Sequence, residues 1–183
     1  MSLIFEAPAS SLSFGQVSYN ILREFWKRNL DIGFFPIGNI DLSCFEPKKE
    51  FVDWLQDAAN KRYSFLKRDV PSLKLWHILS TDTVKTDMLR TPRQTLLTFY
   101  ECSEPSGYER VIVNLQNKTL FSSSYAAQKF GGENVGTFAC GFDPDFYVAD
   151  KKYFQDKVVF GLFGKYENRK ATKQIIQAWV KKY

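Results

Sequence analysis

Residues 3–37 read LIFEAPASSLSFGQVSYNILREFWKRNLDIGFFPI, and this stretch decides the fold class. It begins with an apolar run, continues through a loop rich in Ser and Ala, and then shows apolar residues at helical spacing between Val17 and Trp26. Asn29, a residue type that often ends helices, is followed by a second apolar run over residues 32–37. Strand, helix and strand in this order form the repeating unit of a parallel sheet with right-handed crossovers.

The rest of the chain continues the alternation of short apolar runs and helical patterns. The patterns predict further strands over residues 73–79, 95–100, 119–122, 135–140 and 158–163. They predict helices from residue 47 onward, over 109–115, over 124–130 and from residue 171 onward. Gly131 and Gly132 come directly after the third of these helices and are expected to end it. We therefore predict an α/β fold with a Rossmann-like parallel sheet and flanking helices.

Composition and charge exclude several classes of protein. Hydrophobic residues make up 44% of the 183 residues and charged residues 25%, which is ordinary for a globular protein. The net charge of +5 permits an anionic partner, but acids are interleaved with the basic residues, and we expect no nucleic-acid binding. No apolar run is long enough to cross a membrane, although contact with a membrane surface stays open.

Metal and thiol chemistry have few residues to draw on. The single histidine, His77, cannot form a His-rich metal site, and we place it mid-strand in a structural role. The three cysteines show no CxxC spacing, and their odd number argues against a disulfide framework. A reducing, cytoplasmic location fits this pattern. Asp143 and Asp145 flank a proline and are better explained as turn residues than as metal ligands.

The first candidate site is Ser13-Phe14-Gly15-Gln16, between the first predicted strand and its helix. A glycine at this point allows a ligand to approach the backbone closely, and the N-terminus of a helix favours anions. The alternative is a tight strand-to-helix turn in which Ser13 caps the helix.

The second candidate site is the stretch from Gly161 to Lys170, which contains the cations Lys165, Arg169 and Lys170 and precedes the last predicted helix. Positive charge at a helix N-terminus opposes the helix dipole, and a bound diphosphate would compensate for it. The alternative is a solvated basic loop.

A third candidate is Glu101, just after a predicted strand, where open α/β sheets bind their ligands. Its alternative is a structural carboxylate that pairs with Arg110.

Three motifs, in this order, resemble those of the retaining glycosyltransferases with the GT-B fold that are often called family four. The first is the Ser13–Gln16 loop after the opening strand. The second is Ser122-Ser123-Ser124, a helix, and then Gly141-Phe142-Asp143-Pro144-Asp145-Phe146, which is similar to the family's G-V-D-x-x-x-F run with Phe142 in place of Val and Phe146 one position early. The third places Gly164-Lys165 at the family's Gly-Arg and Lys170-Ala171 at its Lys-Gly, and Ile175-Ile176 follow.

The resemblance implies a domain organisation, a reaction and a set of site residues. Residues 1–146 would form the acceptor-side domain, 147–157 the connector, and 158–183 the first strand and helix of a donor-binding domain. The enzyme would transfer a sugar from a nucleotide-diphosphate sugar to a carbohydrate, lipid or protein acceptor with retention, without a metal or other cofactor. Lys165, Lys170 and Gly15 would bind the donor diphosphate, Ser13, Phe14 and Gln16 would lie on the acceptor side, and Glu101 would be a weak catalytic candidate.

The resemblance also leaves alternatives. The family's paired-glutamate motif would lie beyond Tyr183, so we expect this chain alone to be inactive. The residues themselves also allow a non-catalytic Rossmann-like module that binds a nucleotide or a partner. A nucleotide-dependent epimerase or a phosphorylase of the same fold is a third option. An NAD enzyme is disfavoured because the sequence has no GxGxxG motif followed by an acid.

Overall fold

The computed structural model describes residues 2–79, 86–141, 156–164 and 166–183, and only the backbone of Arg169. The chain divides into two units, Met1–Asp143 and Pro144–Tyr183, and each is treated by itself. Most of the predicted connector over 147–157, and all but the first residue of the Gly141–Phe146 motif, lie outside the described residues.

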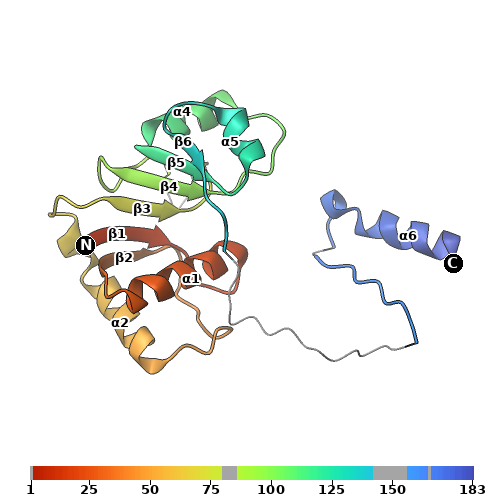
Figure 1. Cartoon of the computed structure of the whole chain (residues 1–183), viewed down its shortest axis with the longest axis horizontal. Coiled ribbons are helices and arrows are strands. Elements are labelled where there is room, and N and C mark those ends of the chain that lie inside the picture. Colours follow the sequence, from red (N-terminus) through yellow and green to blue (C-terminus); the bar gives the residue numbers. More distant parts are fainter. Residues whose placement is uncertain (1, 80–85, 142–155, 165) are drawn as a thin grey trace. The chain divides into compact units, whose positions relative to one another are not determined.

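The first unit is built on six strands, which Figure 1 shows side by side. They are β1 (Ser2–Ala7), β2 (Asp31–Pro36), β3 (Ser72–Leu75), β4 (Gln94–Thr98), β5 (Lys118–Phe121) and β6 (Val135–Thr137). Their order is β2-β1-β3-β4-β5-β6, and every neighbouring pair is parallel. The predicted α/β class with a Rossmann-like parallel sheet is thus confirmed. The first five strands follow one of the two common doubly wound orders.

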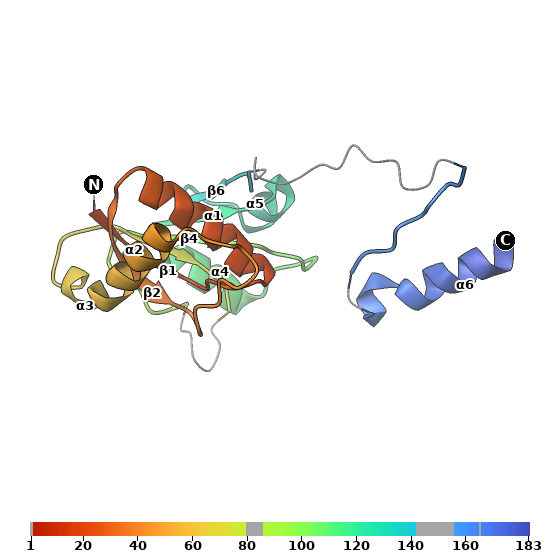
Figure 2. The same ribbon diagram turned by 90° about the horizontal axis from the view of Figure 1, so that it is seen from below.

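Helices cover both faces of this sheet. They are α1 (Ser13–Lys27), α2 (Lys49–Asn60), α3 (Arg62–Phe65), α4 (Gly107–Leu115) and α5 (Ser124–Phe130). Helices α1 and α2 lie side by side on the face that carries Phe5, and there they bury the largest core cluster (Figures 1 and 2). On the opposite face, α3 packs Phe65 against Ile4, and α4 and α5 pack against Phe121.

Local sequence signals explain where several helices begin and end. Ser106 and Glu109 form a reciprocal capping box at the start of α4, in which each side chain accepts a hydrogen bond from the other residue's backbone. Ser123 caps α5, and Gly131 ends it with a positive φ of 63°, as the sequence predicts. Asn29, after α1, also takes a positive φ, of 51°.

Three predictions about the first unit are wrong in detail. Ser13 does not cap α1 but lies inside its first turn, and the preceding Leu12 provides no side-chain hydrogen bond. His77 is not mid-strand, because β3 ends at Leu75 and leaves the histidine in the segment beyond the strand. Strand β6 is also shorter than predicted. In both strands the apolar pattern continues past the last residue that pairs with a neighbouring strand.

The second unit contains a short 3₁₀ helix, η1 (Asn168–Lys170), and the helix α6 (Thr172–Lys182). The predicted helix from residue 171 onward is therefore present. The predicted strand over residues 158–163 is not, and these residues are exposed. A strand needs a neighbour to satisfy its backbone groups, and the described part of this unit offers none. Trp179 of α6 lies with its ring centroid 4.5 Å from that of Phe160.

Candidate functional site

The order of the strands singles out one place on the first unit. From β1 the chain passes first to β2 on one side and later to β3 on the other, so the direction of winding changes between β1 and β3. In open α/β sheets, ligands bind outside the carboxyl ends of the strands at such a switch point. The loop between β1 and α1 and the residues directly after β3 meet at this edge.

Aromatic rings from three segments gather at this edge around Phe14. Its ring centroid lies 4.6 Å from that of His77, 5.6 Å from that of Trp76 and 4.9 Å from that of Phe99. Phe14 comes from the first turn of α1, Trp76 and His77 follow β3, and Phe99 follows β4. The parallel sheet thus joins residues that are far apart in the sequence, and of the predicted loop residues only Phe14 takes part in this ring cluster.

His77 is exposed, and its surroundings shift its pKa. Partial desolvation lowers the pKa of His77 below its ordinary value of 6.5, and the negative charge of Glu101 acts in the opposite direction. The imidazole is therefore neutral at pH 7 and has a carboxylate nearby that favours its protonated form. Glu101, three residues beyond β4, is exposed, while Arg110, its predicted alternative partner, donates to the Phe130 carbonyl at 3.2 Å.

A further polar group at this edge is the indole N–H of Trp76. The indole Nε1 of Trp76 is buried, and within the described part of the chain it has no hydrogen-bond partner. Buried donors are nearly always satisfied, so an orphaned one beside an exposed histidine points to a ligand or water as its partner.

Gly15 has a packing role that its sequence context does not reveal. A Cβ atom built on Gly15 would lie 2.3 Å from the carbonyl oxygen of Ser10, so the chain's own loop occupies the space next to this glycine. The side chain of Gln16 donates to the carbonyl of Ser11 at 2.8 Å, which ties the loop to the helix. Ser13 and Gln16 are exposed, and the first turn of α1 contains no acidic residue.

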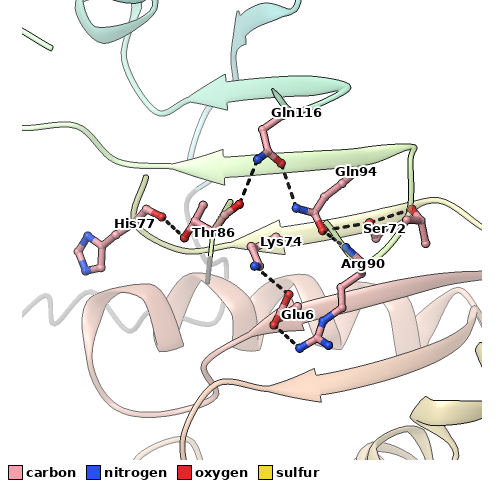
Figure 3. Close-up of polar contacts among 9 residues, drawn as sticks. Glu6, Ser72, Lys74, His77, Thr86, Arg90, Gln94 and Gln116 are labelled. Atoms are coloured by element: carbon pink, nitrogen blue, oxygen red, sulfur yellow. Dashed lines mark hydrogen bonds and ion pairs between the residues drawn. The ribbon is translucent and has the colours of Figure 1, made fainter. Parts of the chain in front are cut away.

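A buried cluster of charges lies on the opposite face of the sheet from α1 (Figure 3). Glu6 of β1 and Lys74 of β3 are register partners, and Lys74 Nζ lies 3.1 Å from Glu6 Oε2. Arg90 Nη2 lies 2.7 Å from Glu6 Oε1, and its guanidinium stacks on Phe35. Burial lowers the pKa of Lys74, while the charge of Glu6 acts against this shift.

Sequence reasoning missed this cluster. The sequence did contain a signal for it, because each of two apolar strands carries one charged residue, Glu6 in LIFEA and Lys74 in SLKL. A strand that is buried on both faces rarely carries an unpaired charge, so the two residues could have been expected to pair.

A chain of amides connects this face with the candidate site (Figure 3). Gln94 Nε2 donates to Gln116 Oε1 at 3.0 Å, and Gln116 Nε2 donates to the carbonyl of Thr86 at 3.2 Å. The hydroxyl of Thr86 donates in turn to the carbonyl of His77 at 3.0 Å. Because Gln94, Gln116 and Thr86 are all buried, these bonds hold the backbone of His77 at the edge.

The predicted diphosphate-binding residues fall in different parts of the chain. Lys165 lies outside the described residues. Lys170 is exposed in η1, in the second unit, while Gly15 belongs to the first. The structure therefore does not test the prediction that they bind one diphosphate.

The described residues contain neither a cluster of metal ligands nor a helix that could span a membrane. Over 2–79, 86–141, 156–164 and 166–183, no three His, Cys, Asp or Glu side chains gather as metal ligands would. No helix in these ranges has the length and apolar character needed to span a bilayer. Cys44, Cys102 and Cys140 are free and exposed.

Comparison with known proteins adds no relative. No family model matches the chain, and neither the curated proteins nor the solved structures gave a significant match.

Proposed function

We propose that the first unit binds the acceptor of a sugar-transfer reaction at the carboxyl edge of its sheet, with His77 beside the reacting hydroxyl. The observation that carries this proposal is the ring contact of Phe14 with His77 at the β1/β3 switch point, where the charge of Glu101 also acts on the imidazole. The resemblance places Tyr100 or Glu101, and not His77, where the family often has a histidine, so His77 enters the proposal only through its position beside Phe14.

The residues at this edge suit the chemistry of such a step. The partly exposed ring of Phe99 can contact the apolar face of a sugar, and the buried ring of Phe14 packs against it. Trp76 has a buried N–H to donate. The acceptor oxygen would form its bond to the sugar carbon as the bond to the diphosphate breaks, and the electron pair would leave with the diphosphate. His77, which is neutral at pH 7, would take the hydroxyl proton, and Glu101 would stabilise the resulting cation.

The donor side of this reaction remains a prediction from the resemblance. Lys165 and Lys170 would hold the diphosphate there, and no metal is part of the proposal. A second function, a ligand-binding module without transfer, is favoured by one observation: residues 158–163 do not form the strand with which a donor domain would begin.

The single histidine offers a direct test, because NMR spectra then contain only one set of imidazole ring signals. We would titrate the protein with a panel of methyl glycosides, with UDP and with UDP-glucose. The proposal predicts that at least one glycoside shifts the His77 signal, and that Phe14→Ala removes this response. Tyr63→Ala, which removes an exposed ring on α3, serves as the matched control and should leave the response intact.

The outcomes separate the two functions. A response to UDP alone, with none to any glycoside, would favour the nucleotide-binding module over acceptor binding. A His77 signal that ignores all the compounds would contradict both. Release of UDP from UDP-glucose is not expected from this chain alone.

A further inference from the structure

The excess positive charge of the protein is concentrated in its last 28 residues. Residues 156–183 contain seven Lys or Arg and two Asp or Glu, which gives the same net charge of +5 as the whole chain. Residues 1–155 contain eighteen of each kind and are neutral overall. The basic residues are thus not evenly scattered, and any general attraction to an anionic partner belongs to the second unit.

The same unit exposes a large set of apolar side chains. No residue of α6 is buried. Phe163 is 92% exposed, Val158 82% and Val180 72%. Other exposed apolar residues of this unit are Val159, Phe160, Leu162, Tyr166, Ile175, Ile176, Trp179 and Tyr183. Three of these rings, those of Phe160, Trp179 and Tyr183, lie in contact, and exposed apolar groups that gather in this way are typical of a site of interaction with a protein or a membrane.

The two kinds of residue are sorted around α6. At about 100° per residue, the apolar side chains fall on one side of the helix, and the lysines and glutamines on the other. The apolar side consists of Ile175, Ile176, Trp179, Val180 and Tyr183.

Two lysines border this apolar side, Lys173 next to Val180 and Lys182 next to Ile175. In these positions the methylene chains of the two lysines can lie along an apolar surface while their ammonium groups reach polar groups.

We propose that the second unit binds the surface of an anionic lipid bilayer, with α6 lying in the interface. The apolar side, including the aromatic rings of Trp179 and Tyr183, would enter the boundary between headgroups and acyl chains, and the lysines would contact anionic headgroups. The inference does not depend on acceptor binding by the first unit. It competes with the donor side of the sugar-transfer proposal, because Lys165 and Lys170 belong to the second unit. It is an alternative to the prediction that residues 158–183 form the first strand and helix of a donor-binding domain.

Other occupants fit these features less well. A nucleic-acid backbone would match the charge but would leave the side chains of Val180 and Ile175 in water. A second copy of the chain would cover the apolar side but would bring together two units that each carry a charge of +5. A bilayer with anionic lipids would place negative headgroups near the lysines and would also cover the apolar side of α6.

The test is flotation of the full chain with vesicles, in phosphatidylcholine alone and in a two-to-one mixture with phosphatidylserine. We expect binding to the mixed vesicles, weakened by added salt, and little binding to phosphatidylcholine. Replacing Lys173, Lys181 and Lys182 together by Gln should weaken binding about a hundred-fold, since each lysine near an anionic surface contributes about a factor of five. Trp179→Ala should also weaken it.

The matched control replaces three exposed lysines of the first unit, Lys48, Lys67 and Lys118, by Gln. It removes the same charge and should leave vesicle binding unchanged. Three results would overturn the inference: no binding to mixed vesicles, equal effects of the two triple variants, or equal binding to both kinds of vesicle. Self-association that Trp179→Ala abolishes, without vesicle binding, would instead identify a second copy as the occupant. Circular dichroism would verify that each variant keeps its helix content.

Discussion

The two units of this chain use aromatic residues in opposite ways. In the first unit, Phe5 is fully buried, with its ring centroid 5.5 Å from that of Phe25 and 6.0 Å from that of Phe34. In the second unit, Trp179 contacts Phe160 and Tyr183 and yet remains 42% exposed. Both residues are large and apolar, so the difference lies in the number of elements that surround them. Among the described residues, six strands and five helices make a core in the first unit, whereas the second unit has one α-helix, one 3₁₀ helix and a segment without regular structure.

Charged residues show the same contrast. In the first unit, exposed charges pair across elements, as in Lys61 with Asp31 and Arg93 with Asp69, and Glu6 is buried between two cations. The second unit carries an excess of positive charge that its own acids cannot balance. The balanced first unit pairs charged groups within itself, whereas the net positive charge of the second unit has no counterpart among its own acids.

The largest effect should come from a cavity in the first core. Phe5→Ala removes a fully buried ring and should lower the free energy of unfolding by about 3–5 kcal/mol. Trp179→Ala in the second unit should change it by less than about 0.5 kcal/mol. Urea denaturation followed by circular dichroism measures both. Similar losses for the two variants would show that Trp179 belongs to a core.

A buried ion pair should come next. Lys74→Met leaves Glu6 buried with Arg90 as its remaining cation and should cost about 3 kcal/mol of unfolding free energy. Adding Glu6→Gln to this variant should recover part of the loss, because no buried charge then remains unbalanced. The control is Lys61→Met, a surface lysine that contacts Asp31 and Asp57, and should cost less than about 1 kcal/mol. Equal costs for the two lysines would refute the role of burial.

A smaller effect should follow from Gly15. Gly15→Ala forces a Cβ atom against the backbone of Ser10 and should cost about 1–3 kcal/mol. Gly107→Ala, at the start of α4, meets no atom within 4 Å and should be neutral or slightly stabilising. Thermal unfolding of the two variants checks this. If Gly15→Ala is also neutral, the loop does not pack as closely as described.

The smallest effect concerns the titration of His77. Its NMR titration should give a pKa below 6.5, and Glu101→Gln should lower that pKa further because it removes a favourable charge. The pKa of His77 in the folded protein lies below its pKa in the unfolded chain. The fold therefore becomes slightly less stable as the pH falls from the unfolded pKa to the folded pKa. Below the folded pKa, that loss is constant. Glu133→Gln, an exposed acid after α5, should leave the titration unchanged. A pKa that rises in Glu101→Gln would contradict the placement of this carboxylate.

The sequence predicted the architecture better than it predicted the site. Strand and helix periodicity, with the stop at Gly131, located every helix of the first unit except α3 and every strand to within a few residues. It could not show that His77 lies past the end of β3, because the apolar alternation continues beyond the last residue that pairs with β4.

The partners within the site depend on tertiary contacts that no local pattern reveals. The proximity of Glu101 to His77, and of Ser10 to Gly15, results from how the sheet and its loops pack. The predicted strand over 158–163 failed for a related reason, since an apolar run forms a strand only where a neighbouring strand pairs with it.

Hydrogen–deuterium exchange, measured with and without vesicles that contain phosphatidylserine, tests the contrast between the units most directly. Backbone amides of β1, β3 and β4 should exchange slowly in both conditions. Those of α6 should exchange fast in solution and slow down on the vesicles. Slow exchange of α6 in solution, or fast exchange of its amides on the vesicles, would contradict the account in which the first unit is stable by itself and lipid covers the apolar side of the second.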